Sequence, residues 1–261
     1  MMHSPANKIY EAMEQSSPED ILRWAFATFG EHVEIASAFG AEGIVLLDIA
    51  AKVKPDLRVF TLDTGFLFPE TLRLMEKIEA RYGIAIERIK PQLTPAEQEI
   101  RYGPALWSRD PDACCNLRKI EPLRRKLSTL GAWITSIRRD QTAARASAAK
   151  VEWDAKFQLM KINPLADWSS DRVWNYIREN RLSYNPLHDR NYPSIGCTHC
   201  TRSVRPGEDP RAGRWAGFAK TECGLHAPSC PSDMVSGITA LSDERATVLS
   251  AAVPGGWPAE S

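Results

Sequence analysis

The sequence predicts an α/β fold with a mainly parallel sheet. Short apolar segments that read as strands alternate with longer amphipathic segments that read as helices. Glycine or a helix-capping residue marks several of the boundaries between them. The composition is that of an ordinary globular protein, since 43% of the 261 residues are hydrophobic and 25% are charged. We expect a ligand site beyond the carboxyl ends of the strands, where open α/β sheets bind their ligands.

The first half of the chain carries clear boundary signals. Ser17 precedes a proline and two acidic residues, an arrangement typical of a helix N-terminus. Gly40 separates a predicted strand from a predicted helix, where backbone N–H groups can face an anion. In order, the expected elements are a helix over 18–29, a strand over 33–39, a helix over 41–53, a strand over 57–63, a helix over 69–83 and a strand over 84–89.

The second half is less regular. The expected elements are helical segments over 94–102 and 113–130, a strand over 132–137, an extended piece starting at 161 and a helix over 170–180 capped by Ser169. From Tyr184 the chain is rich in Pro, Gly, Arg and Cys and has no periodicity. We therefore predict a nucleotide-binding core over 1–183, whose first thirty or so residues form a helical extension, an active-site segment over 184–230 and a flexible tail over 231–261.

Charge and targeting signals restrict the partners and the compartment. The 33 basic and 33 acidic residues balance, so no global field favours nucleic acid or an anionic membrane. The N-terminus has no apolar segment typical of a signal peptide, and Asp48 interrupts the longest apolar run. We expect a cytoplasmic protein. Its six cysteines are then reduced thiols, metal ligands or catalytic groups rather than disulfides.

Four cysteines form two pairs that the fold must bring together. Cys114 and Cys115 are adjacent, whereas Cys197 and Cys200 form a CxxC motif. Three interpretations fit this set: a structural zinc site, a redox dithiol at the CxxC, and a [4Fe-4S] cluster, whose separate irons suit adjacent cysteines. Zinc sites usually have spacers within both pairs, and the CxxC lacks the helix start of a redox motif. All three interpretations stay open on chemistry alone.

A fifth cysteine, Cys223, stands apart from both pairs in the sequence ECGLH. It follows an arginine-rich stretch over 202–214, and a cationic environment favours a thiolate nucleophile. An inert surface thiol is the more common role of a lone cysteine. Cys230 has no basic neighbours and is expected to be inert.

Arginines that recur in the predicted loops match the oxygens of phosphate or sulfate. Neither a GxGxxG nor a P-loop motif is present.

Six motifs, in order along residues 33–226, resemble the assimilatory sulfonucleotide reductases, and in particular the bacterial adenylyl-sulfate (APS) reductases that carry a [4Fe-4S] cluster. These motifs are SAFGAE at 37–42, LDTGxxxPET at 62–71, CCxxRKxxPL at 114–123, RRDQ at 138–141, NPLHDRNYPSIGCTHCTR at 185–202 and ECGLH at 222–226. The resemblance implies an adenine nucleotide α-hydrolase-like fold, with helices on both faces of the sheet and a Cys/Arg-rich segment at its C-terminal side.

The resemblance also implies roles for individual residues. Cys223 would be the nucleophile that forms a thiosulfonate, and thioredoxin or glutaredoxin would then release sulfite from it. One [4Fe-4S] cluster per chain would be held by Cys114, Cys115, Cys197 and Cys200. Contacts with the substrate APS would come from Ser37, Gly40, Leu62, Thr64, Lys119, Ser136, Arg145, Arg211, Arg214 and His226. We also expect a homo-oligomer.

Rival functions make different demands on the sequence. A reductase of the 3′-phosphorylated substrate (PAPS) generally lacks both cysteine pairs, although use of both substrates stays open. A nucleotide-activating ligase or thiolase of related fold would need an SGGxDS loop, which SAFGAEG is not. A non-catalytic metal-binding module would leave Cys223 and the arginines without a role. Phe39 and Ser136 stand where relatives often have serine and glycine, and these two differences affect the implied adenosine contacts.

Overall fold

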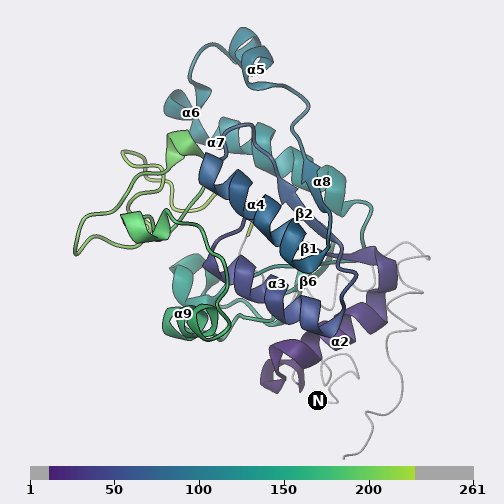
Figure 1. Ribbon diagram of the computed structural model, residues 1–261. Coiled ribbons are helices and arrows are strands. Elements are labelled where there is room, and N and C mark those ends of the chain that lie inside the picture. Colours follow the sequence, from purple (N-terminus) through teal and green to yellow (C-terminus); the bar gives the residue numbers. More distant parts are fainter. Residues whose placement is uncertain (1–11, 227–261) are drawn as a thin grey trace, which may run out of the picture.

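The computed structural model describes residues 12–226, and within them the chain forms a six-stranded sheet (Figure 1). The strand order is β3-β2-β1-β4-β6-β5. Every neighbouring pair is parallel except β5 and β6. The strands are β1 (Val33–Ala36), β2 (Val59–Leu62), β3 (Ile86–Ile89), β4 (Ala132–Ile134), β5 (Val151–Asp154) and β6 (Leu159–Ile162). The predicted α/β class with a mainly parallel sheet is confirmed.

The helices begin and end close to the predicted signals. Ser17 caps the first long helix by accepting a hydrogen bond from the Asp20 backbone N–H. Ser169 caps the last helix in the same way, by accepting a hydrogen bond from the Arg172 backbone N–H. Gly83 ends a helix in the left-handed conformation, with φ 65°. The helices are α2 (Pro18–Phe29), α3 (Ala41–Val53), α4 (Pro69–Tyr82), α5 (Pro95–Tyr102), α6 (Leu106–Arg109), α7 (Pro111–Cys115), α8 (Glu121–Leu127) and α9 (Ser170–Glu179).

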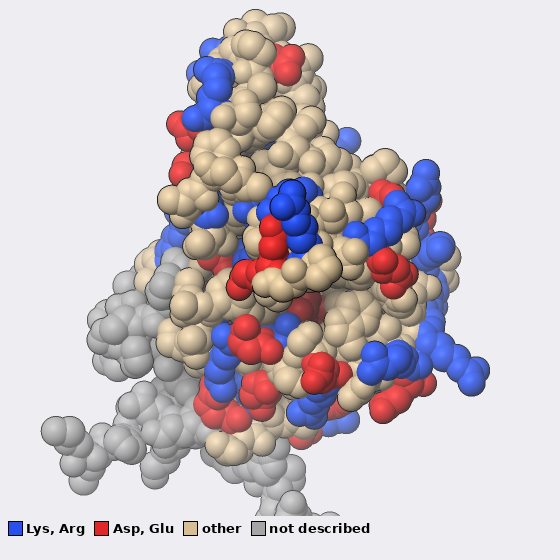
Figure 2. All heavy atoms as spheres, turned by 90° about the vertical axis from the view of Figure 1, so that its left-hand side faces the viewer, with Lys and Arg blue, Asp and Glu red and all other residues tan. Residues whose placement is uncertain are grey.

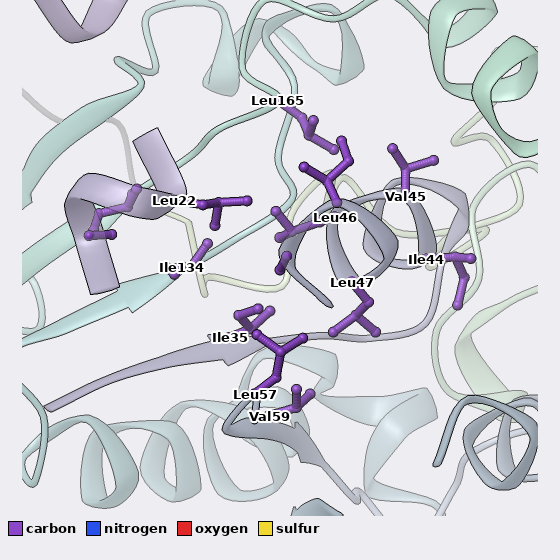
Figure 3. Packing of buried hydrophobic residues seen from close by; sticks show 14 of the residues in the cluster. Leu22, Ile35, Ile44, Val45, Leu46, Leu47, Leu57, Val59, Ile134 and Leu165 are labelled. Carbon is purple, nitrogen blue, oxygen red and sulfur yellow. The ribbon is translucent and has the colours of Figure 1, made fainter. Parts of the chain in front are cut away.

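Two hydrophobic clusters cover the two faces of the sheet. Side chains alternate along a strand, so Val59 of β2 joins one cluster and Phe60 joins the other. Helices α2, α3, α4 and α9 contribute to the first cluster, and α8 contributes to the second. Figure 3 shows Leu46 and Leu47 of α3 beside strand residues of the first cluster. Full burial of one such side chain stabilises the fold by about 1.5–3 kcal/mol. Packing against these helices therefore fixes the positions of the strands.

Several local features differ from the predicted elements, and the strand predicted over 132–137 ends at Ile134. The strand predicted over 33–39 ends at Ala36, and the residues after it turn toward α3. The helix predicted over 113–130 is interrupted by a π-helical turn over Asn116–Ile120. Strand β5 was not predicted. It carries two acidic residues, yet it is fully buried, because Glu152 pairs with Lys161 of β6 at 2.9 Å.

The irregular segment after α9 lies against the loop that follows β2. Cys197 forms a β-bridge with Leu67, and the Thr198 N–H donates to the Phe66 carbonyl at 2.8 Å. Basic and acidic side chains are interspersed on the face shown in Figure 2, in keeping with the balanced charge of the sequence. Among the described residues, no helix combines the length and the apolar character needed to cross a membrane. The tail predicted over 231–261 lies outside the described residues.

Candidate active site

A cavity of about 680 Å³ lies beyond the carboxyl ends of β1, β2 and β4. Strand β1 lies between β2 and β4. The chain therefore continues to β2 on one side of β1 and later reaches β4 on its other side. Open α/β sheets bind ligands at such a reversal of strand order. The cavity is lined by all the residues to which the resemblance assigns a substrate contact and by the proposed nucleophile: Ser37, Gly40, Leu62, Thr64, Lys119, Ser136, Arg145, Arg211, Arg214, His226 and Cys223. Residues from distant parts of the sequence therefore meet in one place.

The turn between β1 and α3 forms one wall of this cavity. Ser37 accepts a hydrogen bond from the Phe39 backbone N–H at 3.1 Å, and Phe39 has φ 57° with its ring buried in the core. A Cβ atom on Gly43 would lie only 2.7 Å from the Ser37 hydroxyl oxygen, so a glycine is needed in this first turn of α3. No side chain caps α3, whose N-cap residue is Gly40. Its free N–H groups can therefore face a ligand.

Two arginines of the irregular segment are held at the cavity by backbone and hydroxyl groups. Arg211 and Arg214 both donate to the Ser194 hydroxyl, at 3.3 and 3.1 Å. The Nε atoms of both arginines are buried and have no hydrogen-bond partner within residues 12–226. A Cβ atom on Gly196 would lie 2.2 Å from an Arg214 nitrogen, so only glycine lets the guanidinium approach this closely. Both arginines line the cavity, and buried donors without partners suit an anionic ligand.

Lys119 lies next to both the large cavity and the cysteine pairs. It lines both the large cavity and a smaller one beside the cysteine pairs. Burial pulls the pKa of Lys119 down, but the charges of Cys197 and Cys223 outweigh burial, so the pKa is raised. Lys119 is therefore a charged group placed between the proposed nucleophile and the paired cysteines.

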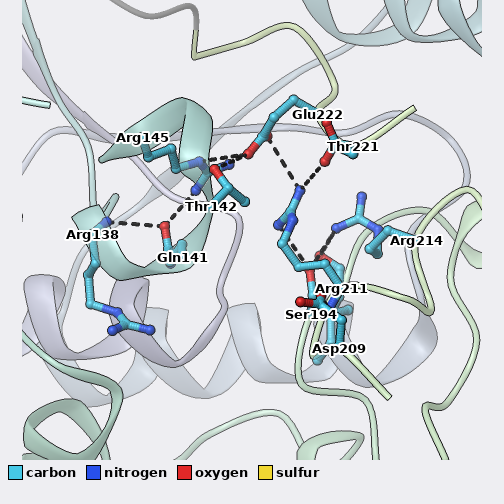
Figure 4. A network of polar contacts seen from close by, with 11 residues as sticks. Arg138, Gln141, Thr142, Arg145, Ser194, Asp209, Arg211, Arg214, Thr221 and Glu222 are labelled. Atoms are coloured by element: carbon cyan, nitrogen blue, oxygen red, sulfur yellow. Dashed lines mark hydrogen bonds and ion pairs between the residues drawn. The ribbon is translucent and has the colours of Figure 1, made fainter. Parts of the chain in front are cut away.

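The segment that carries Cys223 is tied to the core by Glu222 (Figure 4). The carboxylate of Glu222 accepts two hydrogen bonds from Arg145, at 3.0 and 2.8 Å, and one from the Thr142 hydroxyl at 3.0 Å. Arg211 adds a longer contact at 3.4 Å. Burial raises the pKa of Glu222, but the hydrogen bond and charge of Arg145 outweigh burial and lower it overall. Glu222 lies within the ECGLH motif, but no local sequence pattern indicates this role for it.

Further contacts hold the chain on either side of Cys223. Lys156, in the turn between β5 and β6, donates to the Gly224 carbonyl at 2.5 Å, and Lys220 forms an ion pair with Asp112 of α7. Cys223 is a free thiol of intermediate exposure. The proposed nucleophile is thus accessible from the cavity while its neighbours in the chain are fixed. Cys230, expected to be inert, lies outside the described residues.

The two cysteine pairs come together beside this cavity. Cys114 and Cys115 lie at the C-terminus of α7, and Cys200 closes a short 3₁₀ turn. All four cysteines line the smaller cavity, and all four are free. The Cys197 thiol also lies 3.3 Å from the Thr64 hydroxyl at the end of β2. The sequence-distant pairs are therefore neighbours in space, as either a zinc site or a cluster would require.

Burial and mutual charge make these cysteines difficult to deprotonate in the absence of a metal. Burial, together with the neighbouring charges of Cys115 and Cys197, raises the pKa of Cys114 to about 11. Burial likewise raises the pKa of Cys200 to about 11. Without a metal these thiols are protonated, whereas metal ligation would deprotonate them.

Buried Arg118 lies beside the cysteine pairs and lines the same smaller cavity. One of its nitrogens donates to the Thr64 carbonyl at 2.8 Å, but Nε and the other terminal nitrogen are buried without a partner among the residues that the structure describes. The guanidinium also lies over the Phe66 ring at 4.5 Å. In the described part of the chain, no three His, Cys, Asp or Glu side chains converge closely enough to hold a single ion. The free donors of Arg118 lie close to the four cysteines of the smaller cavity.

Comparisons with known proteins agree with this arrangement. Residues 32–203 match the family described as phosphoadenosine phosphosulfate reductase domain. The chain is 47% identical to the adenosine 5′-phosphosulfate reductase of Halalkalibacterium halodurans, over 84% of this chain and 96% of that protein. It is 49% identical to the phosphoadenosine 5′-phosphosulfate reductase of Gloeobacter violaceus, over 82% and 90%. The structure of phosphoadenylyl-sulfate (PAPS) reductase from Candida auris superposes with a TM-score of 0.66 at 31% identity, covering 78% of this chain and 99% of that one. This chain belongs to the phosphoadenosine phosphosulfate reductase domain family.

Proposed function

We propose that this chain reduces adenosine 5′-phosphosulfate (APS) to sulfite and AMP in assimilatory sulfate reduction. The observation that carries the proposal is one cavity that holds the free thiol of Cys223 together with Lys119, Arg145, Arg211 and Arg214. A thiol nucleophile surrounded by cations suits an electrophile within an anionic group. Relatives named adenosine 5′-phosphosulfate reductase, about 47% identical over most of the chain, support the same activity.

In the first step the Cys223 thiolate attacks the sulfur atom of the sulfate group. A bond forms between the two sulfur atoms, and the bond between that sulfur and the bridging oxygen breaks. AMP departs with the electron pair, and the enzyme keeps a thiosulfonate on Cys223. Lys119 and the arginines would stabilise the negative charge that grows on the bridging oxygen and the phosphate. The nucleoside would lie along the strand ends near Ser37, Leu62 and Ser136.

In the second step a dithiol protein of the thioredoxin or glutaredoxin type supplies two electrons. One of its thiolates attacks the Cys223 sulfur, sulfite leaves, and a mixed disulfide remains. The second thiol of the partner then releases Cys223 as a thiol and leaves the partner oxidised. A reducing cytoplasm is the compartment that maintains such a partner.

We infer further that Cys114, Cys115, Cys197 and Cys200 hold one [4Fe-4S] cluster. The unpartnered donors of Arg118 and the four free thiols in one cavity support this donor set. When bound, the cluster would place negative charge beside Lys119 and so influence the electrostatics of the anion site. Reduction itself needs only the thiols of Cys223 and the partner protein. A structural zinc ion is the alternative. Equal amounts of iron and inorganic sulfide in anaerobically purified protein support the cluster, and zinc without sulfide contradicts it.

Reduction of PAPS is a second candidate. The relative from Gloeobacter violaceus, 49% identical, carries the name of a phosphoadenosine 5′-phosphosulfate reductase. Steady-state sulfite release from APS and from PAPS, with thioredoxin as reductant, separates the two candidates. We expect a higher kcat/KM with APS. A higher value with PAPS would transfer the proposal to that substrate, and no sulfite from either would reject both.

A further inference from the structure

We propose that Glu222 is a positioning residue that acts as an internal competitor of the substrate. In this proposal its carboxylate holds the arginine fork of Arg145 when no substrate is bound, and the phosphosulfate group displaces it on binding. The proposal rests on the proposed function, because it takes the ligand of this site to be a nucleoside phosphosulfate. It adds a residue that tunes affinity from within the segment carrying the nucleophile.

The hydrogen bonds of Arg145 are the first argument. Its Nε and one terminal nitrogen donate to the two oxygens of Glu222, at 3.0 and 2.8 Å, which fills the bidentate face of the guanidinium. The other terminal nitrogen donates to the Gln141 side chain at 2.6 Å. Figure 4 shows Arg145 directed at Glu222. An anion that uses the same bidentate face must first move the Glu222 carboxylate away.

Burial and charge form the second argument. The side chains of Arg145 and Glu222 are only 10% and 13% exposed, so this ion pair is poorly screened by water. Arg211 also contacts the carboxylate, at 3.4 Å. Two cations that line the cavity therefore already interact with one internal anion. A sulfate or phosphate oxygen provides the same kind of partner, so both arginines stay paired when a substrate anion replaces the Glu222 carboxylate.

The remaining contacts around Cys223 explain why displacement need not release the nucleophile. Lys156 holds the Gly224 carbonyl, and Lys220 pairs with Asp112, so both anchors lie outside the arginine network. Rotation of the Glu222 side chain alone would free Arg145. Cys223 would then stay over the cavity while the anion enters.

The test compares APS affinity in proteins that cannot turn over. Isothermal titration calorimetry with APS is run on Cys223→Ser and on Cys223→Ser combined with Glu222→Gln. Loss of the competing charge should tighten APS binding about tenfold, the scale of one charge-assisted hydrogen bond. Thr142→Val, which removes a donor to Glu222 without changing any charge, should tighten binding by a smaller factor. Circular dichroism and melting temperature establish that each variant is folded.

Glu208→Gln is the matched control. Glu208 also pairs with an arginine, Arg202 at 2.8 Å, but neither residue lines the cavity, so APS affinity should be unchanged. An unchanged or weaker APS affinity in both the Glu222→Gln and the Thr142→Val variants would overturn the proposal, because a purely structural residue gives that result. Failure of APS to bind even the Cys223→Ser protein would reject the proposed function instead.

Discussion

The imidazole of His226 stacks on the indole of Trp133, with ring centroids 5.6 Å apart and only 9° between their planes. Trp133 lies on β4, so this contact fixes the end of the Cys223 segment to the sheet itself. Burial lowers the pKa of His226 well below 6.5, and the charges of Lys161 and Arg145 lower it further. The ring is therefore neutral near neutral pH, and its buried Nδ1 has no hydrogen-bond partner among the described residues.

The lowered pKa of His226 predicts a loss of stability in mild acid. Below about pH 6.5 the unfolded chain binds a proton at this residue that the folded chain does not bind, so stability falls as the pH falls. The melting temperature should therefore decrease more steeply between about pH 7 and about pH 5.5 in the parent than in His226→Gln. Equal slopes in the two proteins would show that this histidine is not held neutral by the fold.

Lys119 should contribute to the catalytic efficiency, kcat/KM, with APS. We expect Lys119→Gln to lower kcat/KM for APS by about ten- to a hundredfold, because the variant lacks the cation between Cys197 and Cys223. Steady-state sulfite release is the measurement. Lys77, exposed on α4, provides the control, and Lys77→Gln should behave like the parent. Parental kinetics in Lys119→Gln would remove this lysine from the mechanism.

Gly224 should be required for the position of the nucleophile. It has φ 82°, and a Cβ atom there would lie 3.0 Å from the Ile120 side chain. We expect Gly224→Ala to slow sulfite formation about tenfold, which corresponds to about 1.4 kcal/mol of backbone strain. Gly217→Ala places the same kind of strain at φ 91°, where no atom of the described residues lies within 4 Å of the added Cβ, and it should leave the rate unchanged. Equal rates in the two variants would show that the geometry around Gly224 is unimportant.

The buried pair of Glu152 and Lys161 should contribute to stability. Their side chains are only 4% and 2% exposed and meet at 2.9 Å. Lys161→Met leaves a buried carboxylate without its cation, and we expect a loss of about 3–5 kcal/mol in the free energy of unfolding. Adding Glu152→Gln should recover most of that loss, because no unpaired charge remains. Urea denaturation of both variants provides the measurement, and no recovery in the double variant would contradict this explanation.

Local signals in the sequence were enough to predict the core of the fold. The Ser17 cap, the glycine that ends α4 and the apolar strands each depend on neighbouring residues, and the structure confirms them. The substrate and cysteine sets came from motif resemblance rather than from periodicity. The structure gathers these residues at adjoining cavities, and their roles toward substrate and metal stay predictions.

Features that depend on distant partners were not predictable in the same way. Strand β5 contains Glu152 and Asp154, which indicate an exposed segment until Lys161 on β6 is known to lie opposite. Glu222 looked like one more acidic residue, and only the fold places it against Arg145, 77 positions away in sequence. The π-helical turn after Cys115 likewise follows from no local pattern that we recognised. For β5 and Glu222 a tertiary contact decides the structure.

The most direct test is the intact mass of the protein after anaerobic incubation with APS and no thiol. The mechanism predicts an added mass of one SO₃ group on the parent, mapped by peptide analysis to Cys223. It also predicts no addition in Cys223→Ser, whose iron and sulfide content should match the parent. An unmodified parent, or an adduct on another cysteine, would contradict the assignment of Cys223 as the nucleophile.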